Sequence, residues 1–359
     1  MTSNKAVGVG IVGLSANGGW AANAHVPALR EIEGYELRAL SASSPESAKA
    51  AGERHRVPLV FSDPSDLAQH PDVDLVVVTV KVPYHDELIR PALEAGKMVL
   101  SEWPLAADLA RASALADLAG DVHTAIGLQA RSAPPLRYLR DLIADGYVGE
   151  VLSTTLIGTG GAWGATYETG SKYLIDAANG ASLLSIPFGH TADALTMVLG
   201  DIADLSARTA TRRPVVHHAR TGEPATMTSP DQIAATFTLA SGAVGAVHMQ
   251  GGRTQGTNFH WEITGTEGVI VVKAPQAAVW MTPVTLHGAR GDSPLAELPV
   301  PAGYEHVLAG RSAEPAYNVG HAYWQLLQDI TTGTSEVPSF AHAVRLHRLL
   351  EPISSSHRP

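Results

Sequence analysis

The sequence predicts an α/β protein with an N-terminal parallel sheet and a C-terminal α+β domain whose large sheet is mostly antiparallel. The first observation is an apolar, β-branched run at 7–12 that leads directly into a turn of small residues. The second is a series of short apolar strands that alternate with helical patterns up to about Leu128. The third is a later series of strands separated by hairpin-length turns, which indicates antiparallel pairing.

The turn after the first strand approximates a phosphate-binding glycine motif. Gly13 takes the first glycine position, Ser15 takes the second, and Gly18 and Gly19 compete for the third. A helical segment is predicted at 21–30, although Pro27 in its interior disfavours a continuous helix. The N-terminus of such a helix presents free N–H groups to an anion. Strand, glycine turn and helix together predict the start of a Rossmann dinucleotide-binding unit. The alternative is an ordinary glycine turn in an α/β domain.

The elements before residue 128 follow the strand–helix alternation of an open parallel sheet. Strands are predicted at 35–41, 60–61, 74–80, 98–101 and 122–127, and helices at 45–55, 65–69, 85–95 and 107–119. The run 74–80 is the strongest strand pattern, because it is continuous and β-branched as in the interior of a parallel sheet. Pro45 suits the first turn of its helix, and Gly96 suits a helix C-cap.

The pattern changes after Leu128, and Pro134-Pro135 marks the break. Further strands are predicted at 151–158, 202–209, 231–239, 244–250, 258–265, 268–273 and 278–286, with helices at 136–145, after His190 within 182–199, at 312–330 and at 340–355. The glycine-rich, aromatic segment 158–170 is predicted to be a long loop, and such loops usually carry function. We therefore expect two domains, a dinucleotide-binding domain at 1–128 and a substrate and oligomerisation domain at 129–359.

Composition excludes several classes of function. The chain of 359 residues is long enough for two domains, and 45% hydrophobic against 17% charged residues indicates a large core. A net charge of −10 without a Lys/Arg run argues against nucleic-acid binding, and the absence of cysteine excludes disulfides and thiol catalysis. Residues 1–5 lack the apolar core of a signal peptide, and no apolar run reaches the ~20 residues of a membrane helix. We expect a cytoplasmic protein with no membrane partner.

The sequence predicts a nicotinamide nucleotide and no metal. NAD enzymes usually place an acidic residue at the end of the second strand, where it binds the ribose hydroxyls. This chain has no acid there before Glu46, and Ser43 and Ser44 could donate to a 2′-phosphate, although no arginine follows directly. The prediction is therefore NADP, slightly ahead of NAD. His217-His218 lacks a third ligand at zinc-like spacing and is expected to be an exposed polar pair.

Several gapped motifs, taken together, resemble the glucose–fructose oxidoreductase / inositol dehydrogenase (Gfo/Idh/MocA) family. They are Glu102-Trp103-Pro104, the segment from Gln129-Ala130-Arg131 to Pro135, and the segment from Gly180 to His190 and Asp193. A closer resemblance is to a regulatory branch of this family, the fungal galactose-regulon repressors, which bind nicotinamide nucleotides without known turnover. That resemblance rests on motifs from about Val7 to Ser355, including Gly19-Trp20, Lys81-Val82, Trp163-Gly164, Lys172-Tyr173, Gly251-Gly252 and Tyr317-Asn318.

The family resemblance implies an NAD(P)-dependent oxidoreductase that transfers a hydride to or from a sugar or polyol derivative. It also implies a homodimer or homotetramer, paired through the sheet of the second domain. Two departures favour the alternative, a non-catalytic NAD(P)-binding regulator. Trp103 stands where the family has a lysine, and Ile186 stands where catalytic members have an aspartate, four residues before the histidine. Oxidoreductases are commoner in the family, so the enzyme is the first hypothesis.

Four residues are the candidates for proton transfer. His190 shares a helix face with Asp193, and histidine titrates near neutral pH. Lys81 ends the strand 74–80 and could replace the missing lysine; the alternative is a solvated surface lysine. Lys172 and Tyr173 follow the long loop and offer donors.

The cofactor-binding candidates come from the glycine turn and from the carboxyl ends of the strands. Trp103 and Trp163 could each stack on a ring, or could simply pack the core, and His85 could contact the cofactor ring or cap its helix. The full set is Gly13, Leu14, Ser15, Asn17, Gly19, Trp20, Ser43, Ser44, Val80, Lys81, His85, Glu102, Trp103, Gln129, Arg131 and Trp163.

Overall fold

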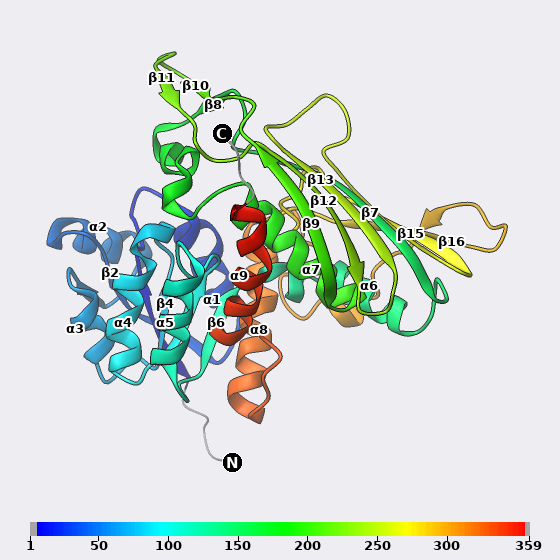
Figure 1. Cartoon of the computed structure of the whole chain (residues 1–359). Coiled ribbons are helices and arrows are strands. Elements are labelled where there is room, and N and C mark those ends of the chain that lie inside the picture. Colours follow the sequence, from blue (N-terminus) through cyan, green and yellow to red (C-terminus); the bar gives the residue numbers. More distant parts are fainter. Residues whose placement is uncertain (1–5, 356–359) are drawn as a thin grey trace. The chain divides into compact units, whose positions relative to one another are not determined.

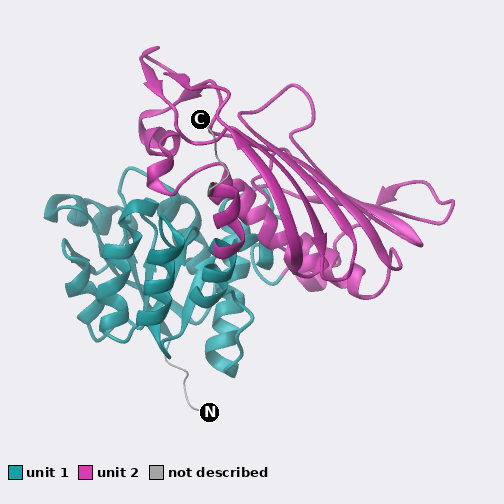
Figure 2. Cartoon of the chain, viewed as in Figure 1, with its two compact units in different colours: residues 1–132, 306–347 teal, residues 133–305, 348–359 magenta. Residues whose placement is uncertain are grey.

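The computed structural model describes residues 6–355, so residues 1–5, where the sequence predicts no signal peptide, lie outside it. The chain forms two compact units, shown in different colours in Figure 2. Unit 1 consists of residues 1–132 and 306–347, and unit 2 consists of residues 133–305 and 348–359. The predicted domain boundary at residue 128 stays a prediction, whereas the contacts group the late segment 306–347 with unit 1.

A six-stranded parallel sheet forms the centre of unit 1, as the sequence predicts (Figure 1). The strand order is β3-β2-β1-β4-β5-β6, so the order reverses beside β1. The strands are β1 (Val7–Val12), β2 (Tyr35–Ser41), β3 (Leu59–Phe61), β4 (Leu75–Val78), β5 (Met98–Glu102) and β6 (Thr124–Gly127). All four residues of β4 are buried, which explains its continuous apolar sequence. Ligands of such sheets bind at the carboxyl edge beside the reversal of order.

The helices of unit 1 cover this sheet. They are α1 (Val26–Glu31), α2 (Pro45–His55), α3 (Pro64–Gln69), α4 (His85–Glu94), α5 (Leu109–Ala119), α8 (Ala316–Thr332) and the first half of α9 (Phe340–Ser355), with short 3₁₀ helices at Val82–Tyr84 and Gln129–Ser132. Helix α2 begins as the sequence indicates, because the Ser44 hydroxyl accepts a hydrogen bond from Ser47 N and Pro45 takes the first turn.

Helix α8 packs into the core of unit 1 although it lies nearly 300 residues after α1 in the chain. Its Tyr323 and Leu326 side chains are fully buried in one apolar cluster with Ile11, Leu29 and Leu40. The sequence assigns this helix to the second domain, and only the contacts place it in unit 1.

Unit 2 is built on an eight-stranded mixed sheet in the order β17-β16-β15-β14-β7-β13-β12-β9. Only the β7–β13 pair is parallel, which confirms the mostly antiparallel prediction. The strands are β7 (Val151–Gly160), β9 (Ile202–Ala210), β12 (Gln232–Leu239), β13 (Val244–Gly251), β14 (Phe259–Gly265), β15 (Gly268–Lys273), β16 (Thr285–Arg290) and β17 (Ala296–Glu297). A small second sheet contains β8 (Thr166–Tyr167), β10 (Val215–His218) and β11 (Pro224–Thr226).

The helices of unit 2 are few. They are α6 (Pro134–Ala144), α7 (Gly189–Leu199), a π-helix at Leu184–Phe188, 3₁₀ helices at Thr169–Ile175, Ala177–Asn179 and Ala302–Tyr304, and the end of α9. Apolar residues of α7 and the π-helix, including Phe188 and Leu195, line a small space with Leu205, Phe237 and Val247 of the sheet. Helix α7 therefore covers one face of the large sheet.

Two local predictions are wrong, and three short strands were not predicted. The segment 21–30 is not one helix, because a π-helix at Ala21–His25 precedes α1, whose first turn contains Pro27. Proline has no N–H for a carbonyl one turn earlier, so the helical ladder changes there. The strand at 278–286 begins only at Thr285, since Met281 N and Thr282 N both donate to the Ala278 carbonyl and close a turn. The strands β8, β10 and β11 were not expected, because two to four residues carry too little pattern.

Within residues 6–355 no helix is long and apolar enough to span a bilayer. The same described residues hold no group of three or more His, Cys, Asp or Glu side chains placed to bind a metal ion.

The buried Asp329 carboxylate of α8 gives a test of this packing. It accepts hydrogen bonds from Thr334 Oγ1 at 2.7 Å, from Glu336 N at 2.9 Å and from Val337 N at 2.8 Å. Replacing it by alanine leaves these donors without their acceptor, so Asp329→Ala should lower the free energy of unfolding by about 3 kcal/mol. Urea denaturation of the variant and of Asp292→Ala, at an exposed position, would measure the difference. Equal stability of the two variants would contradict it.

Candidate functional site

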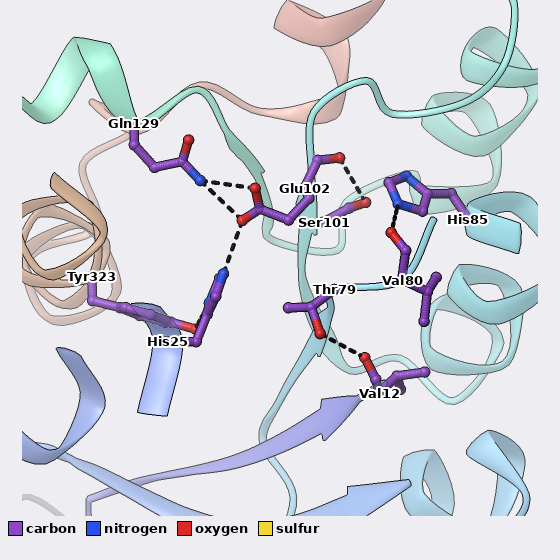
Figure 3. Close-up of polar contacts among 9 residues, drawn as sticks. All are labelled: Val12, His25, Thr79, Val80, His85, Ser101, Glu102, Gln129 and Tyr323. Carbon is purple, nitrogen blue, oxygen red and sulfur yellow. Dashed lines mark hydrogen bonds and ion pairs between the residues drawn. The ribbon is translucent and has the colours of Figure 1, made fainter. Parts of the chain in front are cut away.

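The glycine turn lies at the carboxyl edge of the unit 1 sheet, directly after β1. Gly13 has φ +95°, and a Cβ added there would lie 2.6 Å from Val80 Cγ1. Gly13 N donates to the Ser41 carbonyl at the end of β2, at 3.0 Å. The Thr79 hydroxyl and amide both donate to the Val12 carbonyl, at 3.0 and 3.1 Å, as Figure 3 shows for the hydroxyl. The turn is thus tied to β2 and to the end of β4, and only glycine fits its first position.

A cavity of about 810 Å³ lies beside this turn. Its walls come from the turn, from the start of α2, from the segment after β3 and from the segment after β4, all within unit 1. The lining residues are Val12, Gly13, Leu14, Ser15, Ala16, Asn17, Ser41, Ala42, Ser43, Glu46, Ser47, Ala50, Ser62, Pro64, Val80, Tyr84 and Leu88. Glycine backbone, hydroxyl groups and apolar side chains around a cavity of this size suit a nucleotide.

The cavity brings together six of the predicted cofactor residues: Gly13, Leu14, Ser15, Asn17, Ser43 and Val80. It also contains residues that the sequence analysis missed, among them Glu46, Ser47 and Tyr84. A signal for Glu46 and Ser47 was present, because 46, 47 and 50 are spaced as one face of the helix predicted at 45–55, which follows the second strand.

The other predicted residues at this edge lie outside the cavity lining. Gly19 has φ +107° and accepts from Asn23 N at 3.0 Å, so it belongs to the end of the turn. The Ser44 hydroxyl caps α2. Lys81 is exposed directly before a 3₁₀ helix, and Arg131 is half-buried in another. Their contact with a cofactor stays a prediction.

His55, which the sequence analysis did not select, holds the turn from the last residue of α2. Its Nε2 lies 3.0 Å from the Ser15 carbonyl oxygen, and Arg30 donates to the His55 carbonyl at 2.7 Å. The Ser15 hydroxyl accepts from Asn17 N at 3.1 Å. These contacts hold the turn from α2 and from within the turn itself.

A second polar cluster lies at the ends of β5 and β6 and contains His25, Glu102, Gln129 and Tyr323 (Figure 3). Gln129 Nε2 lies 2.9 Å from each Glu102 carboxylate oxygen, and His25 Nε2 lies 3.0 Å from Oε1. The His25 Nδ1 atom lies 2.8 Å from the Tyr323 hydroxyl. A neutral His25 satisfies both contacts if Nε2–H donates to the carboxylate and Nδ1 accepts from the tyrosine.

This cluster fixes the predicted residues Glu102 and Gln129 as an anchored carboxylate–amide pair, with 15% of the Glu102 side chain exposed. His25 and Tyr323 were not expected. The position of His25 shortly after the glycine turn is a weak sign that it lies near the site. Nothing in the sequence connects Tyr323 of α8 with β5. Trp20, also a predicted cofactor residue, is half-buried, and its ring lies 6.2 Å from the His25 ring in an edge contact.

His85 is buried, and its two ring nitrogens lie 2.9 Å from the Pro104 carbonyl and 3.0 Å from the Val80 carbonyl. Burial lowers the pKa of His85, so the ring is neutral and donates to one carbonyl at a time. His85 therefore braces the chain after β4 against the chain after β5. Its predicted contact with the cofactor ring stays a prediction.

Trp103 is 4% exposed, and its ring lies 4.7 Å from the ring of His347. Burial lowers the pKa of His347 to about 4, so this histidine is neutral at pH 7. The position that carries a lysine in the resembled family is therefore a packed aromatic contact here, with no ionisable side chain of its own. Stacking of Trp103 on a cofactor ring stays a prediction.

The remaining candidates lie in unit 2. His190 and Asp193 are both buried on α7, and the His190 ring stacks on Trp280 with centroids 4.1 Å apart. Trp163 is 5% exposed and donates from its indole N–H to the Leu174 carbonyl at 2.8 Å, which anchors the long loop. These contacts give Trp163 a structural role, and its stacking on a ligand stays a prediction.

The two loop donors differ in exposure. Lys172 is exposed, with Nζ 5.9 Å from the Tyr167 ring centroid. Tyr173 is half-buried, and burial raises its pKa, so its hydroxyl stays protonated at neutral pH and can donate a proton there.

The prediction that His217 and His218 are both exposed is correct for His217 and wrong for His218. His217 is exposed, but His218 is buried, with Nε2 3.0 Å from Thr169 Oγ1 and Nδ1 accepting from Thr221 N at 3.1 Å. The pairing of β10 with β8 turns alternate residues inward and so separates the two side chains.

Comparisons with known proteins agree with this architecture. The model of the oxidoreductase family with an NAD-binding Rossmann fold (GFO_IDH_MocA) matches residues 7–128, and a Gal80p C-terminal domain model matches residues 134–274. Dehydrogenase aclE of Aspergillus oryzae is 36% identical over 304 residues, which are 79% of this chain and 81% of the relative. The galactose/lactose metabolism regulatory protein GAL80 of Saccharomyces cerevisiae is 27% identical in an alignment 403 positions long, gaps included, which covers 97% of this chain and 92% of the relative. A crystal structure of a super-repressor mutant of Gal80p from Saccharomyces cerevisiae has a TM-score of 0.88 at 26% identity, over 98% of this chain and 96% of that one.

The glycine turn can be tested by substitution at Gly13. Gly13→Ala places a methyl group against Val80 at a backbone conformation that favours glycine, so nucleotide affinity should fall on the order of a hundredfold while the fold is kept. Isothermal titration with NAD⁺ and NADP⁺ measures affinity, and far-UV circular dichroism checks the fold. Gly200→Ala is the control, because Gly200 has φ +89° and open space around its Cβ. Unchanged affinity in the Gly13 variant would refute the assignment of the phosphate turn.

The buried histidines predict a loss of stability in acid. The folded-state pKa of His347 is about 4, below the ordinary 6.5, so the unfolded chain binds a proton first as the pH falls. The free energy of unfolding should therefore decrease by up to about 3 kcal/mol between pH 6.5 and pH 4, and His85 adds to the loss in the same direction. Urea denaturation at pH 7 and pH 4.5 should show a smaller decrease for His347→Gln than for the unsubstituted chain. His217→Gln is the matched control, and a profile of His347→Gln that follows this control would contradict the prediction.

Proposed function

This chain belongs to the Gfo/Idh/MocA family of oxidoreductases with an NAD-binding Rossmann fold, and we propose that it transfers a hydride between a nicotinamide dinucleotide and a sugar or polyol derivative. The observation that carries the proposal is the cavity beside Gly13, where a positive-φ glycine, the first turn of α2 and several serine hydroxyl groups line one space at the carboxyl edge of the sheet. The 36% identical relative is itself named a dehydrogenase, which supports the same class of reaction.

The residues present fit a dinucleotide. A Cβ at Gly13 would collide with Val80, so the absence of a side chain leaves the turn's backbone accessible to a pyrophosphate. Ser15 and Asn17 belong to the same turn, and Ser43 and Ser47 line the wall after β2, where hydroxyl groups can bind ribose oxygens. The dinucleotide would supply the hydride acceptor or donor. The sequence favours NADP slightly, and both coenzymes belong in the test.

Four side chains are proposed for proton transfer to or from the substrate oxygen. Lys81 follows the central strand of unit 1 and carries the ammonium group that Trp103 cannot supply. His190, Lys172 and Tyr173 belong to unit 2, where His190 is held by Trp280 and Tyr173 is protonated at neutral pH. A side chain that gives a proton to the substrate oxygen, or takes one from it, suits alcohol–carbonyl chemistry.

A second candidate function is a non-catalytic nucleotide-binding regulator. The observation that favours it is Trp103, buried against His347 at the family's lysine position. The GAL80 relative, named a regulatory protein, aligns over 97% of this chain, and the Gal80p C-terminal domain model matches residues 134–274 of unit 2. Such a regulator would need a protein partner instead of a turnover substrate.

The proposal includes a cytoplasmic homodimer or homotetramer that pairs through the large sheet of unit 2. The apolar side chains of Leu152, Ile157 and Val244 are 50%, 38% and 57% exposed. They lie on the neighbouring strands β7 and β13. Exposed apolar side chains on adjacent strands suit an interface between subunits.

Single-turnover absorbance distinguishes the two functions. The full chain, loaded with NADH or with NADPH, is mixed with a panel of keto-sugars and sugar aldehydes. We expect the nicotinamide absorbance to decay with at least one panel member. The same decay in Lys81→Met, His190→Asn, Lys172→Met and Tyr173→Phe variants would then identify the proton donor by a loss of about a hundredfold or more in rate. Tight nucleotide binding with no decay across the panel would contradict the enzyme and favour the regulator.

A further inference from the structure

We propose that Glu46 makes this site select NAD over NADP. This inference rests on the proposed function, because it concerns the same nucleotide cavity, and it reverses the slight preference for NADP that the sequence suggests. Glu46 lies in the first turn of α2, beyond the end of β2, and it lines the cavity together with Ser43 and Ser47.

The position of Glu46 follows from the direction of the nucleotide on this fold. A pyrophosphate at the Gly13 turn directs the adenosine ribose toward the carboxyl end of β2, where the 2′-hydroxyl or 2′-phosphate is recognised. In this chain that region is the wall formed by Ser41, Ala42, Ser43, Glu46 and Ser47. The 2′ substituent would therefore meet the wall that contains Glu46.

The charges on this wall disfavour a phosphate. Among the described residues that line the cavity, Glu46 carries the only ionisable carboxylate, and none is lysine or arginine. A 2′-phosphate usually pairs with an arginine near this position, whereas a 2′-hydroxyl can donate to a carboxylate. The serine hydroxyls can bind either substituent, but as neutral groups they offset little of the repulsion between two anions.

The Glu46 carboxylate is ionised in the pH range where the coenzymes are stable. Its own backbone N–H and then the Ser44 hydroxyl lower the pKa of Glu46. The Ser44 hydroxyl also caps α2, so the segment that presents the carboxylate has a defined start. A solvated carboxylate beside a phosphate of about two negative charges should weaken NADP binding on the order of tenfold, and salt should reduce this effect.

Binding without turnover tests the inference. Isothermal titration of the full chain with NAD⁺ and NADP⁺, and with 5′-AMP and adenosine 2′,5′-bisphosphate, isolates the contribution of the 2′-phosphate. We expect affinity for NAD⁺ at least about tenfold above that for NADP⁺ at low salt, with a smaller ratio at high salt. Glu46→Gln should reduce the ratio about tenfold and Glu46→Lys should reduce it further, both by raising NADP⁺ affinity. The control is Glu53→Gln, which removes the same charge from an exposed position of α2 outside the cavity.

Three outcomes would overturn the inference. The first is NADP⁺ bound as tightly as NAD⁺ by the unsubstituted chain, and the second is a ratio that stays the same in Glu46→Gln; both leave the proposed nucleotide site intact. The third is equal effects of Glu46→Gln and Glu53→Gln, which would indicate net charge instead of a local contact. If neither coenzyme binds at all, the proposed function itself fails and the inference fails with it.

Discussion

The close approach of the chain at Gly13 to the end of β4 is the constraint on which the nucleotide cavity depends. The left-handed backbone of Gly13 brings the turn against Val80, and its amide is used by the Ser41 carbonyl of β2. A side chain at this position would push the turn away from the carboxyl edge of the sheet. Three neighbouring strands, β2, β1 and β4, therefore meet at one residue, and the cavity opens beside it.

The Glu102 cluster places a second fixed set of polar groups further along the same edge. Glu102 lies between the Gln129 amide and the His25 ring, and His25 in turn contacts Tyr323 of α8. The carboxylate is thus held by the segment after β6 and by the helix after the glycine turn, whose His25 is in turn held by Tyr323 of the returning C-terminal segment. These contacts favour one arrangement of the elements, because removing the Gln129 amide or the His25 ring would take a hydrogen bond from the largely buried Glu102 carboxylate.

The next residue, Trp103, separates this chain from the pattern of the family it belongs to. The indole packs on His347, whose burial keeps it neutral at pH 7. Proton transfer, if the chain is an enzyme, must then come from residues outside the lysine motif. Nucleotide binding and proton transfer therefore rest on different residues in this chain. A formed cavity within unit 1 supports nucleotide binding, whereas the candidates for proton transfer belong to both units.

The sequence by itself determined the fold class and nearly all the longer strands and helices. It also identified six residues that line the cavity, Gly13 among them. These features depend on local patterns of apolar, glycine and capping residues. Tertiary structure alone decided which distant segments meet. It placed Tyr323 beside His25, Tyr84 on the cavity wall and Trp103 on His347, and it buried His218 but not His217. It also converted the expected strand before Thr285 into a turn that stacks Trp280 on His190. Such contacts depend on residues far apart in the chain, and a local pattern carries no information about which of many apolar or polar partners will be the neighbour.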